Sequence, residues 1–194
     1  IGMVAIAFIP RDKEDVIKIT AAVATGLQLL LTLVLWQNYD AGDGGMQFMV
    51  RAEWIPSFNI TYILGVDGLS LPMAILTALL CFIGVFVSWN INKAVKGYFS
   101  LFLLLNTGVM GVFLSLDFFL FYIFWEVMLL PMYFLIGMWG GPQREYAAIK
   151  FFLYTLFGSV LMLIAILALY FTCGNTFDML LLMDTAPTAL NGVL

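Results

Sequence analysis

The stretch "FLFYIFWEVMLLPMYFLIGMWGG", residues 119–141, is apolar except for one acidic residue, Glu126. A helix needs about 20 predominantly apolar residues to cross a hydrocarbon core about 30 Å thick, and this stretch is long enough. Asp117, just before it, is a side-chain type that caps the first turn of helices. We therefore predict a membrane-spanning helix over residues 117–139 that carries a carboxyl group inside the membrane.

The composition of the whole chain agrees with a membrane protein. It is 63% hydrophobic and only 10% charged, and its mean hydropathy is +1.05, which leaves too little polar surface to cover a soluble globule. The chain has no histidine, which excludes histidine-based metal sites and Ser/His/Asp catalysis within it. Cys81 and Cys173 lack metal-ligand spacing and are interpreted as apolar fillers. We expect the lipid bilayer as a partner, and no nucleic acid.

Apolar segments of spanning length recur along the chain, and a shorter one at residues 1–10 looks cut from a longer segment. Counting that segment, we predict six crossings and an all-α polytopic bundle. The five full-length spans are expected at residues 16–37, 70–89, 97–115, 117–139 and 146–171. We treat residues 1–194 as a single membrane domain, with N-terminal spans in 1–89 and outer loops at 38–68 and 173–194.

The basic residues predict the orientation of these spans. Cytoplasmic loops collect Lys and Arg, and alternating the predicted spans places seven of the eight basic residues on one side, with only Arg51 opposite. We therefore expect the loops at residues 10–15, 90–96 and 140–145 to face the cytoplasm of a bacterium, across its plasma (inner) membrane.

The outer loop at residues 38–68 contains a strand pattern. In "FNITYILGV" the residues Ile60, Tyr62, Leu64 and Val66 alternate with a period of two, and "QFMVRAEW" precedes them across Pro56. The pattern favours a β-hairpin on the outer surface. An irregular loop is the alternative.

Glu126 is the principal candidate for chemistry. It lies nine residues after Asp117, about 13 Å along the helix and close to the middle of the membrane. A charge there must be neutralised by protonation, paired or hydrated, and Pro131 leaves the carbonyl of Val127 without its helical donor. These features indicate a proton site. The alternative is a permanently protonated glutamate that bonds to a neighbouring helix.

Three further polar residues are weaker candidates for supporting roles. Lys150 lies only about four residues into the last predicted span, so it either assists proton transfer or extends to the interface. Tyr154 lies one turn deeper on the same face. Asn106, beside Thr107, lies at nearly the depth of Glu126 and could share a polar layer with it. Packing and bonding within the helices is the alternative for Asn106.

Three segments together resemble a known family. They are "WIPSFNITYILGVDGLSLP" (54–72), "LDFFLFYIFWEVMLLPMYFLIGMWG" (116–140) and "YAAIKFFLYTLFGSVLMLIAILALY" (146–170). They are similar to subunit M, or chain 4, of proton-pumping NADH:quinone oxidoreductase, respiratory complex I, whose antiporter-like fold contains inverted repeats. The resemblance extends from about residue 10 onward. It implies that residues 97–172 begin the antiporter-like repeat and that Glu126 works with lysines in proton transfer.

The resemblance also implies which subunits of the complex carry the redox cofactors. The chain has neither a Gly-rich nucleotide-binding fingerprint nor a cysteine set for an iron–sulfur cluster, so flavin, iron–sulfur clusters and quinone are expected in partner subunits. The partners expected are other antiporter-like membrane-arm subunits. The family's interrupted span, with its main partner lysine, is expected after residue 194. A Mrp-type cation/proton antiporter subunit is the alternative function, and a passive membrane scaffold fits poorly with a midplane glutamate.

Overall fold

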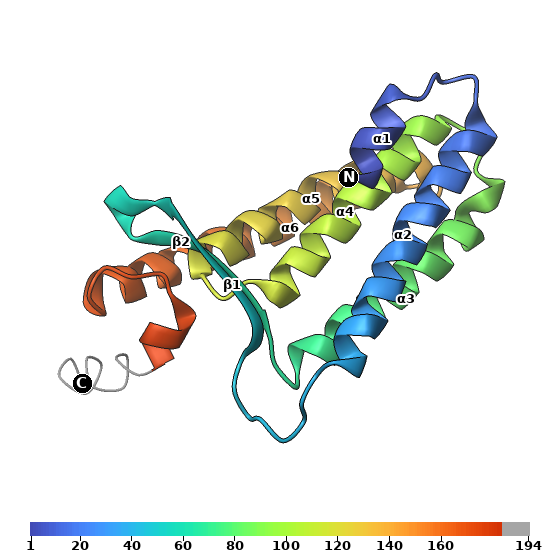
Figure 1. The fold of residues 1–194 in the computed structure, drawn as a ribbon. Coiled ribbons are helices and arrows are strands. Elements are labelled where there is room, and N and C mark those ends of the chain that lie inside the picture. Colours follow the sequence, from blue (N-terminus) through green and yellow to red (C-terminus); the bar gives the residue numbers. More distant parts are fainter. Residues whose placement is uncertain (184–194) are drawn as a thin grey trace.

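The computed structural model describes residues 1–183 and contains a bundle of long helices with a small hairpin at one end (Figure 1). Five of its helices are long and apolar enough to cross a membrane. They are α2 (Glu14–Gln37), α3 (Ser70–Val87), α4 (Val95–Leu114), α5 (Phe118–Trp139) and α6 (Arg144–Thr172). These helices confirm the five full-length spans predicted from the sequence.

The first predicted crossing is only a short helix in the part of the chain that the structure describes. Helix α1 (Gly2–Phe8) has only seven residues, so it covers about 10 Å of the membrane thickness. It ends at Phe8, and the next residue, Ile9, precedes Pro10 and the charged segment that leads into α2. The residue before a proline is biased toward extended backbone, and Ile9 has ψ of 132°.

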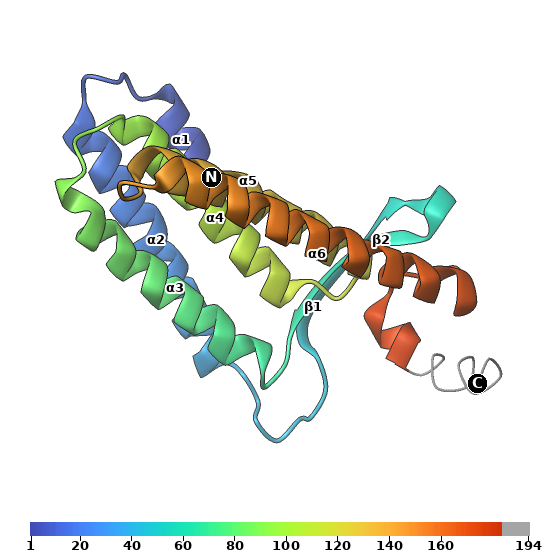
Figure 2. The same ribbon diagram turned by 180° about the vertical axis from the view of Figure 1, so that it is seen from behind.

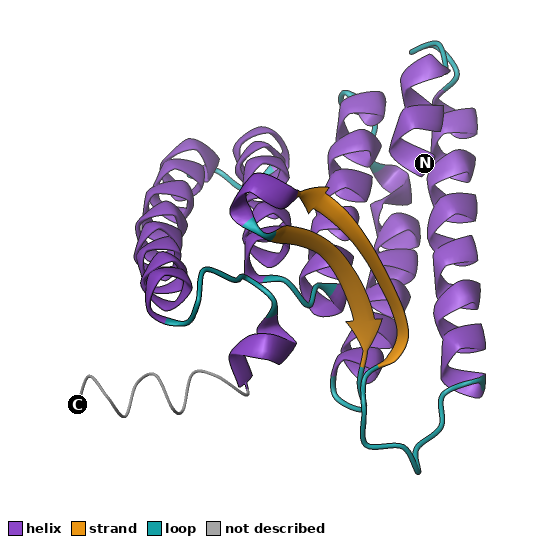
Figure 3. Ribbon diagram, turned by 60° about the vertical axis from the view of Figure 1, so that its left-hand side comes forward, coloured by secondary structure: helices purple, strands orange, loops and turns teal. Residues whose placement is uncertain are grey.

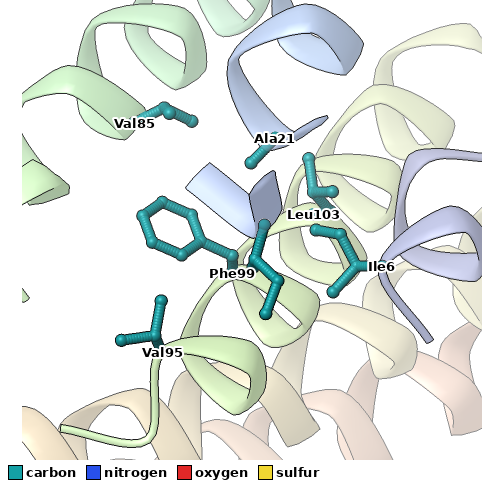
Figure 4. Close-up of a cluster of buried hydrophobic side chains, with 7 residues drawn as sticks. Ile6, Ala21, Val85, Val95, Phe99 and Leu103 are labelled. Atoms are coloured by element: carbon teal, nitrogen blue, oxygen red, sulfur yellow. The ribbon is translucent and has the colours of Figure 1, made fainter. Parts of the chain in front are cut away.

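A buried apolar cluster joins α1 to helices α2, α3 and α4. Phe99 of α4 is fully buried at its centre, and Ile6 of α1 and Val85 of α3 reach the same cluster (Figure 4). The remaining buried members are Ile17, Ala21, Val95 and Leu103. This cluster makes α4 the central helix of this half of the bundle.

The outer loop forms the predicted β-hairpin. Strand β1 (Gln47–Ile55) pairs antiparallel with β2 (Ile60–Val66), and a short 3-10 turn at Pro56–Phe58 connects them (Figure 3). Strand β2 also contacts the α4–α5 junction, where the backbone N–H of Leu116 donates to the carbonyl of Ile63 at 3.0 Å. The hairpin therefore covers the end of the bundle at which α5 begins.

The turns between α1 and α2, α3 and α4, and α5 and α6 all lie at the opposite end from the hairpin (Figures 1 and 2). Hydrogen bonds tie these turns together. Lys96 donates to the carbonyls of Ala7 and Ile9 at 2.9 and 2.8 Å, and the indole of Trp139 donates to the carbonyl of Lys93 at 2.7 Å. The three loops with most of the basic residues thus share one end of the bundle.

The chain after α6 returns to the hairpin end. Asp178 pairs with Asp117 in an isolated antiparallel bridge, and a short helical turn follows from Met179 to Met183. The predicted outer loop at residues 173–194 is described only to residue 183, so its remainder lies outside the described residues.

Candidate functional site

Helix α5 carries the candidate site, and its first turn is fixed by Asp117. The Asp117 carboxylate accepts from the backbone N–H groups of Phe119 and Leu120 at 2.9 and 3.1 Å, as predicted for an N-cap. The same carboxylate accepts from the Thr61 backbone at 3.3 Å. Burial raises the pKa of Asp117 above its ordinary value, although these hydrogen bonds oppose the shift.

Two glycines let α5 approach α4 closely beside the site. A methyl group added at Gly111 would lie 2.2 Å from the ring of Phe124, and one added at Gly108 would lie 3.1 Å from the Phe124 carbonyl. Small residues permit such close helix contacts in membranes. Phe124 is two residues from Glu126, so this contact fixes the position of that part of α5 against α4.

Glu126 is half-buried on α5, and one of its oxygens lacks a partner. Within residues 1–183, its Oε1 atom is buried and forms no hydrogen bond. A buried polar group left unsatisfied costs about 1–3 kcal/mol, and more if it is charged. Such an atom is suited to bind a proton or to meet a cationic partner.

Tyr122 is a polar neighbour of Glu126 that sequence reasoning missed. Tyr122 lies one turn before Glu126, and both residues line the same surface hollow. The spacing of four residues on one helix could have indicated Tyr122. Ser159 of α6 is buried and donates to the carbonyl of Leu156 at 3.0 Å.

A surface hollow of about 420 Å³ lies beside Glu126. It is lined by Tyr122 and Glu126 together with apolar residues of α4 and α5: Leu104, Ile123, Val127 and Leu130. A larger hollow, of about 760 Å³, surrounds the turn Gly140–Tyr146 at the loop end. Only the smaller one contains a carboxyl group within a predicted span.

Lys150 and Tyr154 are not brought to Glu126 in the described structure. Both side chains are exposed on α6, and the Lys150 ammonium lies 5.6 Å from the centre of the Tyr146 ring. Tyr133 contacts Phe152 with ring centres 5.5 Å apart, which sets the register of α5 and α6. Lys150 is then about nine residues, or about 13 Å, from Glu126 along the helix axes.

Asn106 is buried on α4 but faces α2. Its amide donates to Gln28 Oε1 at 2.5 Å and accepts from Gln28 Nε2 at 3.1 Å. Asn106 is two residues, about 200°, from Gly108 around the helix, and Gly108 faces α5. The structure therefore pairs Asn106 with Gln28, while the neighbouring Thr107 donates to the carbonyl of Leu103 at 2.9 Å.

A second cluster of polar residues lies at the hairpin end, outside the predicted spans. Arg51 of β1 forms an ion pair with the nearly buried Asp178, which also accepts from the backbone N–H of Leu180 at 2.9 Å. Asn59 donates to the carbonyl of Asn175 at 3.1 Å. These contacts fasten the hairpin to the segment after α6.

Comparison with known proteins identifies relatives of the chain. Residues 115–193 match the family described as "NADH:quinone oxidoreductase/Mrp antiporter, TM". NADH-quinone oxidoreductase subunit M of Rhodobacter capsulatus is 44% identical over 167 residues, which are 86% of this chain and 32% of that protein. NADH-ubiquinone oxidoreductase chain 4 of Chondrus crispus is 42% identical over 178 residues, which are 91% of this chain and 36% of that protein.

A solved structure extends the likeness to the fold. A chain of respiratory complex I from Thermus thermophilus with bound NADH matches with a TM-score of 0.81 and 29% identity, covering 95% of this chain and 37% of that one. The chain spans about a third of the length of these relatives. Residues 115–193 match that family, and the chain as a whole is similar to membrane subunits of NADH:quinone oxidoreductases.

Proposed function

We propose that the chain is part of a proton-translocating membrane-arm subunit of an NADH:quinone oxidoreductase, and that Glu126 is its proton-transfer group. The observation that carries this proposal is the buried Oε1 atom of Glu126, which has no hydrogen-bond partner within residues 1–183. A carboxyl group in a spanning helix is costly when charged and unpaired. It therefore changes its protonation when a nearby charge or its access to water changes.

Partner subunits supply the driving force in this proposal. Flavin, iron–sulfur clusters and quinone in those subunits carry electrons from NADH to quinone. The resulting change of charge or conformation reaches the membrane arm through neighbouring antiporter-like subunits. The part played by this chain is to hold a carboxyl group where its protonation responds to that change, on a helix fixed by the Asp117 cap and the Gly111 contact.

Supporting roles for the other candidate residues remain part of the proposal. Lys150, with Tyr154 one turn further along α6, contributes positive charge near the loop end of the path. Asn106, bonded to Gln28, keeps α2 and α4 in register beside the α4–α5 contact.

We place the protein in the plasma membrane of a bacterium, with the loops at residues 10–15, 90–96 and 140–145 in the cytoplasm. The enrichment of basic residues at this end of the bundle supports the placement, because cytoplasmic loops retain Lys and Arg.

A Mrp-type cation/proton antiporter subunit is the second candidate, since the matching family description names both classes. Such a subunit would exchange protons for another cation without electron transfer. A passive scaffold would not need a carboxyl group within a spanning helix.

Purification of the natural complex through a tag on the full-length subunit tests the proposed function. We expect flavin- and iron–sulfur-containing subunits to co-purify, and the complex to oxidise NADH with quinone. Recovery of a complex without redox centres, which exchanges protons for sodium or potassium in vesicles without NADH, would support the antiporter function instead.

A further inference from the structure

The segment after α6, residues 173–183, lies against the start of α5, and we call it the strap. Asp178 of the strap and Asp117, the residue before α5, lie opposite each other in an antiparallel bridge. Two backbone hydrogen bonds flank this pair, at 2.9 and 3.0 Å: Phe118 N–H to the Phe177 carbonyl and Met179 N–H to the Leu116 carbonyl. Release of the strap from α5 must break both bonds.

Side chains also hold the strap in place. Arg51 of β1 forms an ion pair with Asp178, which is almost fully buried. The rings of Phe119 and Phe177 lie with their centres 5.7 Å apart. The strap is therefore fastened to the hairpin by a charge pair, and to α5 by backbone and ring contacts.

Asp117 is a buried carboxyl group beneath the strap. It is fully buried, and its oxygens accept from the first turn of α5 and from Thr61. Within residues 1–183, no basic side chain forms an ion pair with it. Asp117 precedes α5, so it lies outside the spanning helix, and burial raises its pKa above the ordinary value.

Release of the strap changes the surroundings of Asp117. Residues opposite each other in an antiparallel pair have neighbouring side chains on the same face, so the strap shields the Asp117 carboxyl on one side. Water that enters when the strap leaves favours the ionised form. The closed form therefore binds the proton more tightly than the released form does, and protonation favours closure.

We propose that the strap is a pH-sensitive closure over the start of α5, held most tightly when Asp117 is protonated and released more often when Asp117 is ionised. Below the ordinary pKa of Asp117, both forms carry the proton and closure is strongest. As the pH rises from there to the raised pKa of the closed form, the released form loses its proton first, so release becomes more frequent. Closure of the strap does not depend on the role of Glu126.

Other titratable side chains occur on each element packed around Asp117. Arg51 and Asp178 pair with each other. Glu53 of β1 is exposed in a hollow that Arg51, Thr61 and Asp178 also line, where solvent screens its charge. The titratable side chains of α4, Lys96 and Tyr98, lie at the opposite end of the bundle. The other neighbouring elements contribute residue types that are uncharged in acidic solution: Tyr62 of β2, Tyr122 of α5, Tyr170 of α6 and Cys173 of the strap.

Hydrogen exchange of the strap, in the assembled complex with the full-length subunit, tests the inference. Mass spectrometry follows the backbone amides of peptides that contain Phe118 and Met179, from about pH 4 to about pH 8, with correction for the intrinsic pH dependence of exchange. In the wild type we expect the corrected exchange to rise with pH, about tenfold for each pKa unit that separates the closed and released forms.

Three variants identify the group that responds to pH. Asp117→Asn keeps the cap, because Asn caps helices about as well as Asp, but it cannot ionise. Its corrected exchange should match the wild type in acid and stay flat, and so fall below the wild type at neutral pH. Arg51→Gln removes the ion pair and should raise exchange at every pH while keeping the rise with pH. Asp43→Asn is the matched control, since Asp43 accepts from the Gly45 N–H at 3.0 Å but is exposed, and it should keep the wild-type profile.

The wild-type profile alone can overturn the inference, whether or not each variant assembles, because flat corrected exchange would exclude a pH-sensitive closure. Retention of the wild-type rise by Asp117→Asn would also overturn it. Loss of the rise in Arg51→Gln would do the same, since the ion pair would then be the group that responds. These measurements use neither NADH oxidation nor pumping, so a failure here leaves the proposed role of Glu126 standing.

Discussion

Lys150 lies exposed near the beginning of α6, about 13 Å along the helix axes from Glu126. If it assists proton transfer by its charge, Lys150→Arg should retain more pumping than Lys150→Ala. Proton pumping per NADH oxidised, in the assembled complex, is the measurement. Lys93→Ala is the control, because the Lys93 side chain is exposed at the same end of the bundle. Normal pumping by both Lys150 variants would show that Lys150 only extends to the membrane interface.

At the level of single residues, the sequence is enough to predict features that depend only on where a residue lies along its own helix. The place of Glu126 within α5 and the cap formed by Asp117 follow from counting residues from the start of a helix. Side-chain partners depend on rotation and register between helices, which hydropathy does not encode. The sequence therefore placed Asn106 at a similar depth to Glu126 without showing that it faces Gln28.

The α4–α5 contact is the element-level feature most sensitive to substitution. Gly111→Ala would place a methyl group 2.2 Å from the ring of Phe124, so the helices must separate or the ring must move. We expect a loss of stability of about 1–3 kcal/mol, together with weaker assembly. Thermal unfolding of the purified complex measures this loss.

Gly137→Ala is the matched control for this contact. Gly137 is also helical, but an added methyl group would lie 3.5 Å from Ala148, an ordinary van der Waals separation. The control should change the unfolding temperature little. Equal stability of the Gly111 and Gly137 variants would contradict the close contact between α4 and α5.

The helices and strands themselves could be predicted well from the sequence. Each full-length span agrees with its helix to within two residues at either end, because long apolar segments have few alternatives in a membrane. The hairpin is harder to predict from the sequence, since short alternating segments also occur in irregular loops. Strand β2 is secured by contacts with Leu116 and Asp117, which lie far from it in the sequence.

At the scale of the whole molecule, the two ends of the bundle should lie on opposite sides of the membrane. Single cysteines at Gly44, before the hairpin, and at Asn92, in the α3–α4 turn, test this in intact cells after Cys81 and Cys173 are replaced by serine. We expect an impermeant thiol reagent to label position 44 from outside, and position 92 only after the cells are opened. Labelling of both positions from the same side would contradict the orientation.

Proton pumping by the Glu126→Gln variant tests the central claim most directly. Glutamine keeps the shape of the side chain and much of its hydrogen bonding but cannot exchange a proton. The assembled variant complex is reconstituted in sealed vesicles, and assembly, NADH:quinone turnover and the proton gradient are measured separately. We predict normal assembly with a sharp fall in pumping and in coupled NADH oxidation. A correctly assembled Gln variant that pumps at the wild-type rate would show that Glu126 is a structural residue and would contradict the account.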